Sequence, residues 1–112
     1  MNLQDRFCAY LKAYENKDLD GIAAMLADAV KLRDWKISVT GKDAALAETR
    51  ANFAAAQSIR IEVLRLYESA ASVAGELRIL VDGTIELFVV DVLDFDTQGQ
   101  ITAIRAFLGR GD

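Results

Sequence analysis

The sequence predicts an α+β fold, in which three N-terminal helices pack on a curved antiparallel sheet. Apolar residues recur at helical spacing in the first half of the chain, whereas apolar and polar residues alternate as in strands in the second half. Short turns, two of which contain glycine, separate the later strands. With 112 residues, 53% of them apolar, the chain is expected to form one domain over residues 1–112, with a core and a pocket.

The first two helices are predicted from apolar spacing and a capping residue. Over residues 3–15 the apolar positions lie on one stripe of a helix: Leu3, Phe7, Tyr10, Leu11 and Tyr14. Asp18 can cap a second helix, because its carboxylate can accept a hydrogen bond from a free N–H group of the first turn. This second helix is expected to end near Ala27 or Asp28.

A strand, a third helix and four further strands are predicted in the rest of the chain. Side chains alternate over Ala29–Trp35, which indicates a short strand. Gly41 marks a break, and the alanine-rich segment from Lys42 to Ala56 favours a helix. The remaining strands are expected over Ser58–Glu68, Ala71–Val81, Thr84–Phe95 and Ile101–Leu108, with the last three forming a meander.

Composition restricts the chemistry that this chain can perform. It contains no histidine and one cysteine, which excludes an internal disulfide, cysteine-rich zinc patterns, Ser-His-Asp triads and Cys-His dyads. Acid–base chemistry must therefore come from carboxylates, tyrosines or lysines with shifted pKa values. Neither a metal ion nor a cofactor is expected.

Charge and hydropathy exclude two classes of partner. The net charge of −4 argues against nucleic-acid binding, which needs a basic surface. No segment approaches the ~20 uninterrupted apolar residues of a membrane span. The N-terminus lacks the basic start and apolar stretch of a signal peptide, so a cytoplasmic location is expected.

Three polar residues occupy positions where the pattern predicts buried side chains. Tyr10 lies within the apolar stripe of the first helix, and Asp34 shares a strand face with Val30 and Leu32. Asp91 shares a face with Val89 and Leu93, where an ionised carboxylate must be paired, solvated by a pocket or protonated.

Each of these residues also has a purely structural interpretation. The Tyr10 hydroxyl can donate to a backbone carbonyl in the core. Asp34 can be a turn or capping residue, and a bulge can turn Asp91 out to solvent. If all three face one cavity, they suit proton transfer beside a carbonyl without a metal. An ionised aspartate then removes the proton, and neutral O–H groups stabilise the enolate oxygen.

Several segments resemble the ketosteroid isomerase branch of the NTF2-like, or SnoaL-like, superfamily. Tyr10–Ile22 resembles the tyrosine-bearing first helix and the turn that follows it, and Val30–Asp34 resembles the strand that carries the base. Asp91–Phe95 and Arg105–Gly109 resemble the strand with the second functional aspartate and the closing strand. This branch is the standard example of a neutral carboxylic acid that donates a hydrogen bond.

The resemblance implies a cystatin-like cone around an apolar pocket and a cofactor-independent isomerase. It assigns Asp34 as the general base and Tyr10 and protonated Asp91 as the oxyanion hole, acting on a small hydrophobic, steroid-like ligand. It also implies a homodimer through the sheet, where the second face of one strand is apolar. The residues expected to line the substrate pocket are Phe53, Ile104, Ala106 and Leu108.

Other functions of the same fold stay open at this point. The chain can instead be a non-catalytic or differently catalytic NTF2-like domain that binds a small hydrophobic ligand, with Tyr10 and Asp91 holding one another. A dimerisation module with a filled cavity is a third possibility. An epoxide hydrolase would require an Asp-Arg-Asp arrangement, for which Arg105 is the available arginine although its spacing does not favour it.

Overall fold

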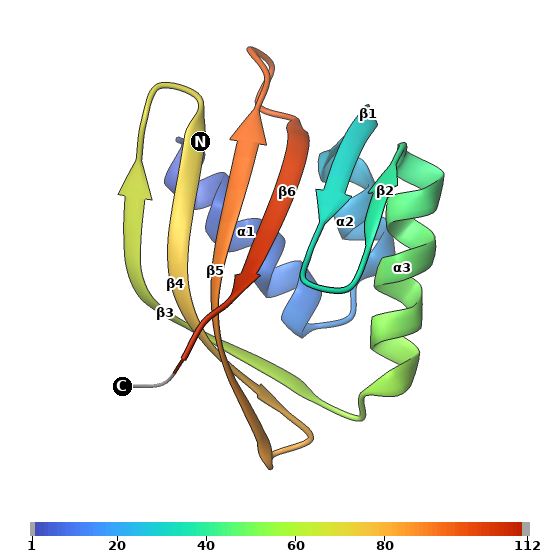
Figure 1. Cartoon of the computed structure of the whole chain (residues 1–112). Helices are drawn as coiled ribbons and strands as arrows, with labels where there is room; N and C mark the ends of the chain where they lie inside the picture. The colour runs from blue at the N-terminus through green and yellow to red at the C-terminus, as the bar shows by residue number, and fades with distance from the viewer. Residues whose placement is uncertain (1, 111–112) are drawn as a thin grey trace.

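The structure, a computed structural model, describes residues 2–110 (Figure 1). Its nine elements are α1 (Leu3–Glu15), α2 (Leu19–Met25), β1 (Leu26–Arg33), β2 (Ser38–Thr40), α3 (Lys42–Ala55), β3 (Ile59–Glu68), β4 (Ser72–Val81), β5 (Ile85–Phe95) and β6 (Ile101–Leu108). All strands belong to one sheet in the order β2-β1-β6-β5-β4-β3. None of the described helices is long and apolar enough to cross a membrane.

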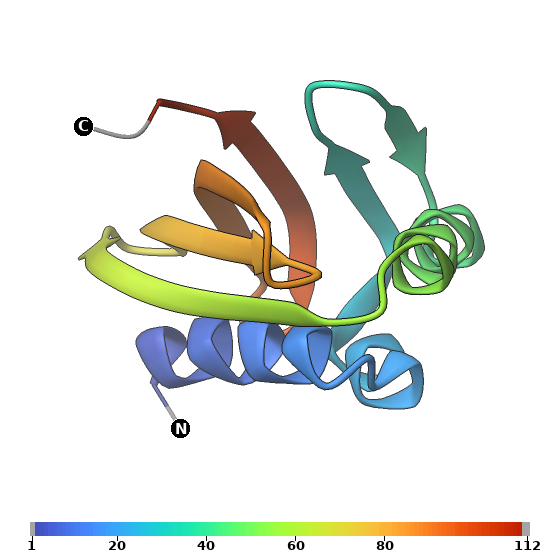
Figure 2. The same ribbon diagram turned by 90° about the horizontal axis from the view of Figure 1, so that it is seen from below.

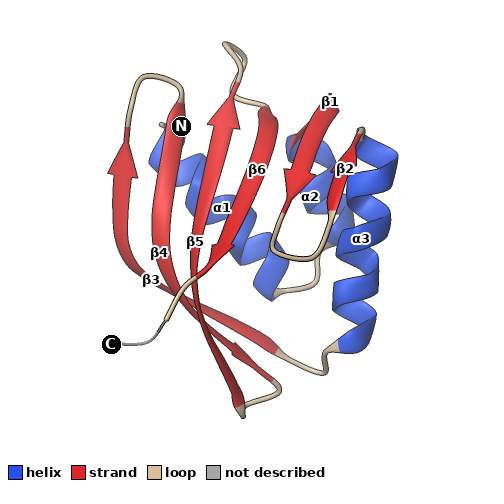
Figure 3. Ribbon diagram, viewed as in Figure 1, coloured by secondary structure: helices blue, strands red, loops and turns tan. Residues whose placement is uncertain are grey.

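The helices lie on one side of a strongly bent, unclosed sheet (Figures 2 and 3). The Asn2 side chain caps α1 by accepting from the Asp5 N–H at 2.8 Å, and the Asp18 side chain caps α2 as predicted. At the other end of α1, Glu15 accepts a hydrogen bond from the Ile61 backbone N–H at 2.7 Å. These contacts fix α1 against the sheet, with its apolar stripe directed inward.

Most elements agree with the sequence prediction, but the sheet differs in three ways. First, α2 ends at Met25 and β1 starts directly at Leu26, earlier than predicted, because Leu26 already has extended backbone. Second, the short strand β2 was not predicted; it pairs with β1 from Arg33↔Ser38 to Lys31↔Thr40. Third, the sheet is mixed and not purely antiparallel, since β1 runs parallel to β6.

The parallel pairing joins segments that are remote in the sequence. Leu32 pairs with Ile104 and Arg33 with Arg105, although one helix, α3, and four strands lie between β1 and β6 in the sequence. Alternation of side chains indicates that a strand exists but not which distant strand it pairs with. Hairpin neighbours, in contrast, follow from a short turn, and the β4–β5–β6 meander was predicted correctly.

Gly75 sets how closely α1 approaches the sheet. A Cβ at this buried position would lie 2.6 Å from Phe7 Cζ and 3.2 Å from Leu66 Cδ2. The Phe7 ring, which is fully buried, therefore occupies the space that a side chain at residue 75 would need. We expect Gly75→Ala to destabilise the protein by about 1–3 kcal/mol through overpacking, measured by urea unfolding.

A double-mutant cycle provides the control for this prediction. Phe7→Leu alone should also destabilise, because it removes buried ring volume. In the Gly75→Ala/Phe7→Leu pair the smaller side chain accommodates the new methyl group, so the combined loss should be smaller than the sum of the single losses. Strict additivity would contradict the proposed contact.

Candidate active site

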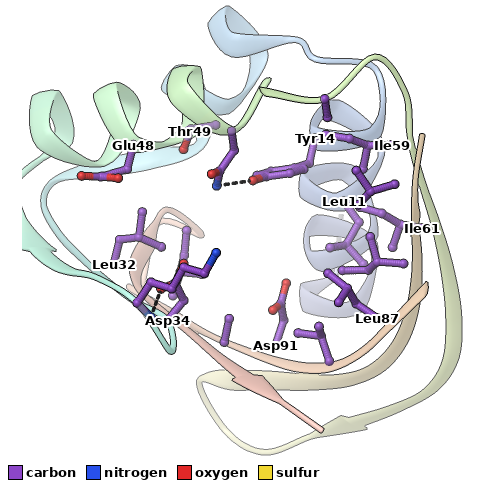
Figure 4. Close-up of a pocket in the computed structure, with 18 of the residues that line it drawn as sticks. Leu11, Tyr14, Leu32, Asp34, Glu48, Thr49, Ile59, Ile61, Leu87 and Asp91 are labelled. Atoms are coloured by element: carbon purple, nitrogen blue, oxygen red, sulfur yellow. Dashed lines mark hydrogen bonds between the residues drawn. The ribbon is translucent and has the colours of Figure 1, made fainter. Parts of the chain in front are cut away.

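A cavity of about 510 Å³ lies between α1, α3 and the inner face of the sheet (Figure 4). This volume is within the range that holds small organic ligands. Aliphatic side chains from β1 and from β3 to β5 form most of its apolar wall, among them Leu32, Ile59, Ile61, Ile79, Leu87 and Val89. The polar side chains that reach the cavity come from α1, α3, β5 and the β1–β2 turn.

Tyr10 projects from the inward stripe of α1 into this cavity. The residue is only 4% exposed, and no group within residues 2–110 forms a hydrogen bond with its hydroxyl. Burial first, followed by the nearby Asp91 and Tyr14, raises the Tyr10 pKa well above its usual value of 10. The hydroxyl therefore keeps its proton and is free to donate a hydrogen bond to a ligand.

Asp91 lies on the inner face of β5 with its carboxyl group in the cavity. The pairing of β4 with β5 is continuous here, so no bulge turns Asp91 toward solvent. Its partners across the two neighbouring strands are Gly75 and Ala106, and Ala106 lines the cavity beside it. In the described part of the chain no side chain hydrogen-bonds to that group.

This environment favours the neutral form of Asp91. Burial is the main cause and the negative charge of Asp34 is the second, and together they raise the Asp91 pKa from 3.8 to about 7. A neutral carboxylic acid is a hydrogen-bond donor, so Asp91 and Tyr10 can both donate into the same cavity.

Asp34 lies in the tight turn between β1 and β2, immediately after β1 ends at Arg33, although the strand was predicted to continue to Trp35. Its Oδ1 accepts hydrogen bonds from the backbone N–H groups of Lys36 at 2.7 Å and Ile37 at 2.9 Å. The turn interpretation of this residue is therefore correct, and the carboxylate also lines the cavity. The two N–H donors orient the carboxylate and leave its Oδ2 available to a ligand.

Trp35 follows Asp34 at the cavity rim. The alternation that placed Trp35 opposite Asp34 ends with the strand at Arg33, and both residues line the cavity. The indole remains 43% exposed. It therefore forms part of the pocket mouth.

Of the four residues predicted to line the substrate pocket, two line the cavity and two do not. Ile104 and Ala106 contribute to the cavity wall, as expected. Phe53 and Leu108 are absent from that wall, which corrects the prediction: Phe53 is buried behind Tyr14, and Leu108 ends β6 with 49% exposure. Side-chain parity indicates which face a residue belongs to, but not how far along a strand the cavity extends.

Sequence reasoning did not identify several polar residues of the cavity. Tyr14 was assigned only to the apolar stripe of α1, although it lies one helical turn after Tyr10 on that stripe. The structure brings it to Asn52 of α3, whose Nδ2 donates to the Tyr14 hydroxyl at 2.9 Å. Glu48, Thr49 and Lys36 also line the cavity. Only the packing of α3 against α1 and the sheet could reveal this group.

Arg105 and Asp94 lie on the opposite face of the sheet. The Arg105 guanidinium donates to both Asp94 carboxylate oxygens, at 2.7 and 2.9 Å. This pair holds the Asp94 pKa below its usual range. Because neither residue lines the cavity, the structure does not provide an Asp-Arg-Asp arrangement there through Arg105. Residues 2–110 also contain no cluster of three or more carboxylate, cysteine or histidine side chains suited to a metal ion.

Three helices on a curved, mixed six-stranded sheet, with a largely apolar pocket between the layers, define an NTF2-like domain. The chain belongs to the SnoaL-like family, since the SnoaL-like domain matches residues 7–104. No curated protein sequence matches the chain.

Solved structures with this fold have varied activities. The epoxide hydrolase/cyclase-like enzyme SalBIII, which has a role in pyran ring formation in the polyether salinomycin, aligns with a TM-score of 0.83 and 21% identity over 96% of this chain and 90% of its own. A candidate ketosteroid isomerase from Kribbella flavida aligns with a TM-score of 0.81 and 17% identity over 98% and 79%. An LEH-like epoxide hydrolase from Mycobacterium tuberculosis aligns with a TM-score of 0.80 and 20% identity over 94% and 80%. At such identities these similarities establish the fold alone.

Proposed function

We propose that the protein is a cofactor-independent isomerase that moves a β,γ double bond into conjugation with a ketone. The observation that carries this proposal is the presence in one cavity of two unpartnered O–H donors, Tyr10 and neutral Asp91, together with an oriented carboxylate, Asp34. Two donors and one base are the groups that enolisation requires.

The reaction proceeds through a dienolate. The Asp34 carboxylate removes the proton from the carbon between the ketone and the double bond, and the electron pair moves onto the carbonyl oxygen. Tyr10 and Asp91 donate hydrogen bonds to that oxygen, where negative charge develops. Asp34 then returns the proton to the far carbon of the dienolate, which leaves the conjugated enone and regenerates the carboxylate.

The apolar wall supports a flat hydrophobic substrate. Aliphatic groups such as Leu32, Ile61 and Leu87 surround the polar centre, so a ring system can be desolvated while its ketone meets Tyr10 and Asp91. A steroid-like ring system is the substrate that we propose, following the resemblance to ketosteroid isomerases. A domain that binds such a ligand without turnover is the alternative, since SnoaL-like proteins share one fold across different chemistries.

The test is the conjugated-enone absorbance that develops when purified protein meets a β,γ-unsaturated 3-ketosteroid. Turnover well above buffer is expected. A folded protein that binds the product enone but gives no turnover would favour the binding alternative. Tight binding of the product enone that is unaffected by substitution of Asp91, without turnover, would exclude the proposed oxyanion hole.

We also propose that the protein forms a two-fold dimer through the outer face of its sheet. Phe88, Val90 and Val92 of β5 are half-buried on this face, and Phe107 lies opposite Val90 with 55% of its surface exposed. An apolar face of this kind is commonly covered by a second copy. Sedimentation velocity should give twice the chain mass of 12.3 kDa for the wild type.

The variant for this test places a charge at the centre of the apolar face. Phe107→Glu is expected to shift the protein to monomer, because two carboxylates would be desolvated at the interface. Gln98→Glu, in the exposed β5–β6 turn, adds the same charge away from the face and should remain dimeric. A monomeric wild type at tens of micromolar would exclude the dimer.

A further inference from the structure

A second polar pair faces the cavity, separate from the three residues of the proposed reaction. Asn52 of α3 donates to the Tyr14 hydroxyl of α1, and both residues line the cavity. Figure 4 shows Tyr14 across the cavity from Asp91 and Asp34. The proposed isomerisation uses neither Tyr14 nor Asn52.

The Tyr14 hydroxyl can still donate one hydrogen bond. Its oxygen accepts from Asn52, and within residues 2–110 no group accepts its proton. Burial raises the Tyr14 pKa above 10, so the proton stays on the oxygen at neutral pH. Asn52 in turn retains its carbonyl oxygen as an acceptor. The pair thus presents one donor and one acceptor side by side.

The aromatic rings around Tyr14 hold this pair in place. The Phe53 ring packs edge-on against the Tyr14 ring at a centroid distance of 4.9 Å, and the Tyr10 ring lies 6.1 Å away. The next residue, Glu15, is hydrogen-bonded to β3 through the Ile61 N–H. A phenol that has an aromatic ring on two sides and a backbone anchored at the next residue loses little rotational freedom when a ligand binds, which favours recognition of a polar atom.

We infer that Tyr14 and Asn52 form a second subsite that binds a distal oxygen function of the substrate. This inference rests on the proposed function, in which Tyr10 and Asp91 hold the reacting ketone. The substrate class is then a flat hydrophobic molecule with two oxygen functions, such as a diketone or a hydroxyketone. A hydroxyl uses both the donor and the acceptor of the pair, whereas a carbonyl uses the Tyr14 donor.

Planar phenols provide a test that does not depend on turnover. 2-Naphthol mimics the dienolate with a single oxygen, and naphthalene-2,6-diol adds a second hydroxyl at the far end of the same ring system. We expect the diol to bind the wild type about three- to tenfold more tightly than 2-naphthol, the value of one additional neutral hydrogen bond. Fluorescence titration of each ligand measures the ratio.

Tyr14→Phe should remove this advantage, because it deletes the hydroxyl but keeps the ring that packs on Phe53. Asn52→Ala should reduce the advantage, since the Tyr14 hydroxyl loses its fixed orientation. Tyr67→Phe is the matched control: it deletes an exposed hydroxyl that is bonded to Glu76 outside the cavity, and it should leave the ratio unchanged.

Two outcomes separate this inference from the proposed function. A diol advantage that is absent in the wild type, or unchanged in Tyr14→Phe, would overturn the second subsite. 2-Naphthol binding that is unaffected by Tyr10→Phe would instead contradict the oxyanion hole. For a diketone substrate, Tyr14→Phe should raise KM with little change in kcat, as expected for a group that contacts a part of the substrate remote from the reaction.

Discussion

Asp34→Asn is expected to lower kcat/KM for a β,γ-unsaturated ketone by about 10²- to 10⁴-fold, the contribution typical of a general base. The amide cannot remove a proton, but its Oδ1 can still accept the backbone hydrogen bonds from Lys36 and Ile37 that shape the turn. The loss should therefore appear in kcat, with the fold and ligand binding preserved. Enone absorbance measures turnover, and 2-naphthol titration measures binding.

Asp28→Asn is the matched control for this prediction. Asp28 is an exposed acid on β1, and it does not line the cavity. The same substitution there removes one negative charge and should leave turnover unchanged. If Asp34→Asn retained full activity, Asp34 would be a turn residue alone and the base would have to be sought elsewhere in the cavity.

Asp91 is expected to make the protein less stable as the pH rises from about 4 to about 7. Its folded-state pKa of about 7 lies above the ordinary 3.8, so between these values the folded state binds a proton that the unfolded state has released. The stabilisation is complete below the unfolded pKa and is lost as the pH rises through the folded pKa. Three pKa units correspond to about 4 kcal/mol.

Asp91→Asn removes this titration and keeps a neutral group of similar size. The free energy of unfolding, measured by urea unfolding across this pH range, should therefore increase for the variant relative to the wild type as the pH rises. The difference should be largest above pH ~7. Asp28→Asn should follow the wild-type pH profile. Parallel profiles for Asp91→Asn and the wild type would show that folding does not raise the Asp91 pKa.

The same ionisation should control activity. If only neutral Asp91 donates to the oxyanion, kcat/KM should fall as the pH rises through about 7, approaching tenfold per unit. Asp91→Asn should lose that alkaline limb, because an amide donor does not titrate there. Asp91→Ala removes the donor, and a loss of about 10²- to 10³-fold is expected below pH ~7, where wild-type Asp91 is neutral.

The sequence by itself determined most of the local elements and the inward position of Tyr10 and Asp91. Helical spacing identified the stripe that carries Tyr10, and alternation placed Asp91 on the buried face of β5, because both patterns depend only on the geometry of one element. These positions were conspicuous since a polar group in an apolar row needs a physical reason.

Contacts between remote segments were decided by the tertiary structure alone. The parallel pairing of β1 with β6 and the hydrogen bond from Asn52 to Tyr14 each join groups whose relation no local pattern encodes. Phe53 illustrates the reason: it was expected to line the substrate pocket, but the packing of α3 against α1 placed its ring behind Tyr14. Periodicity specifies which face a side chain occupies, whereas its partner depends on how two elements pack.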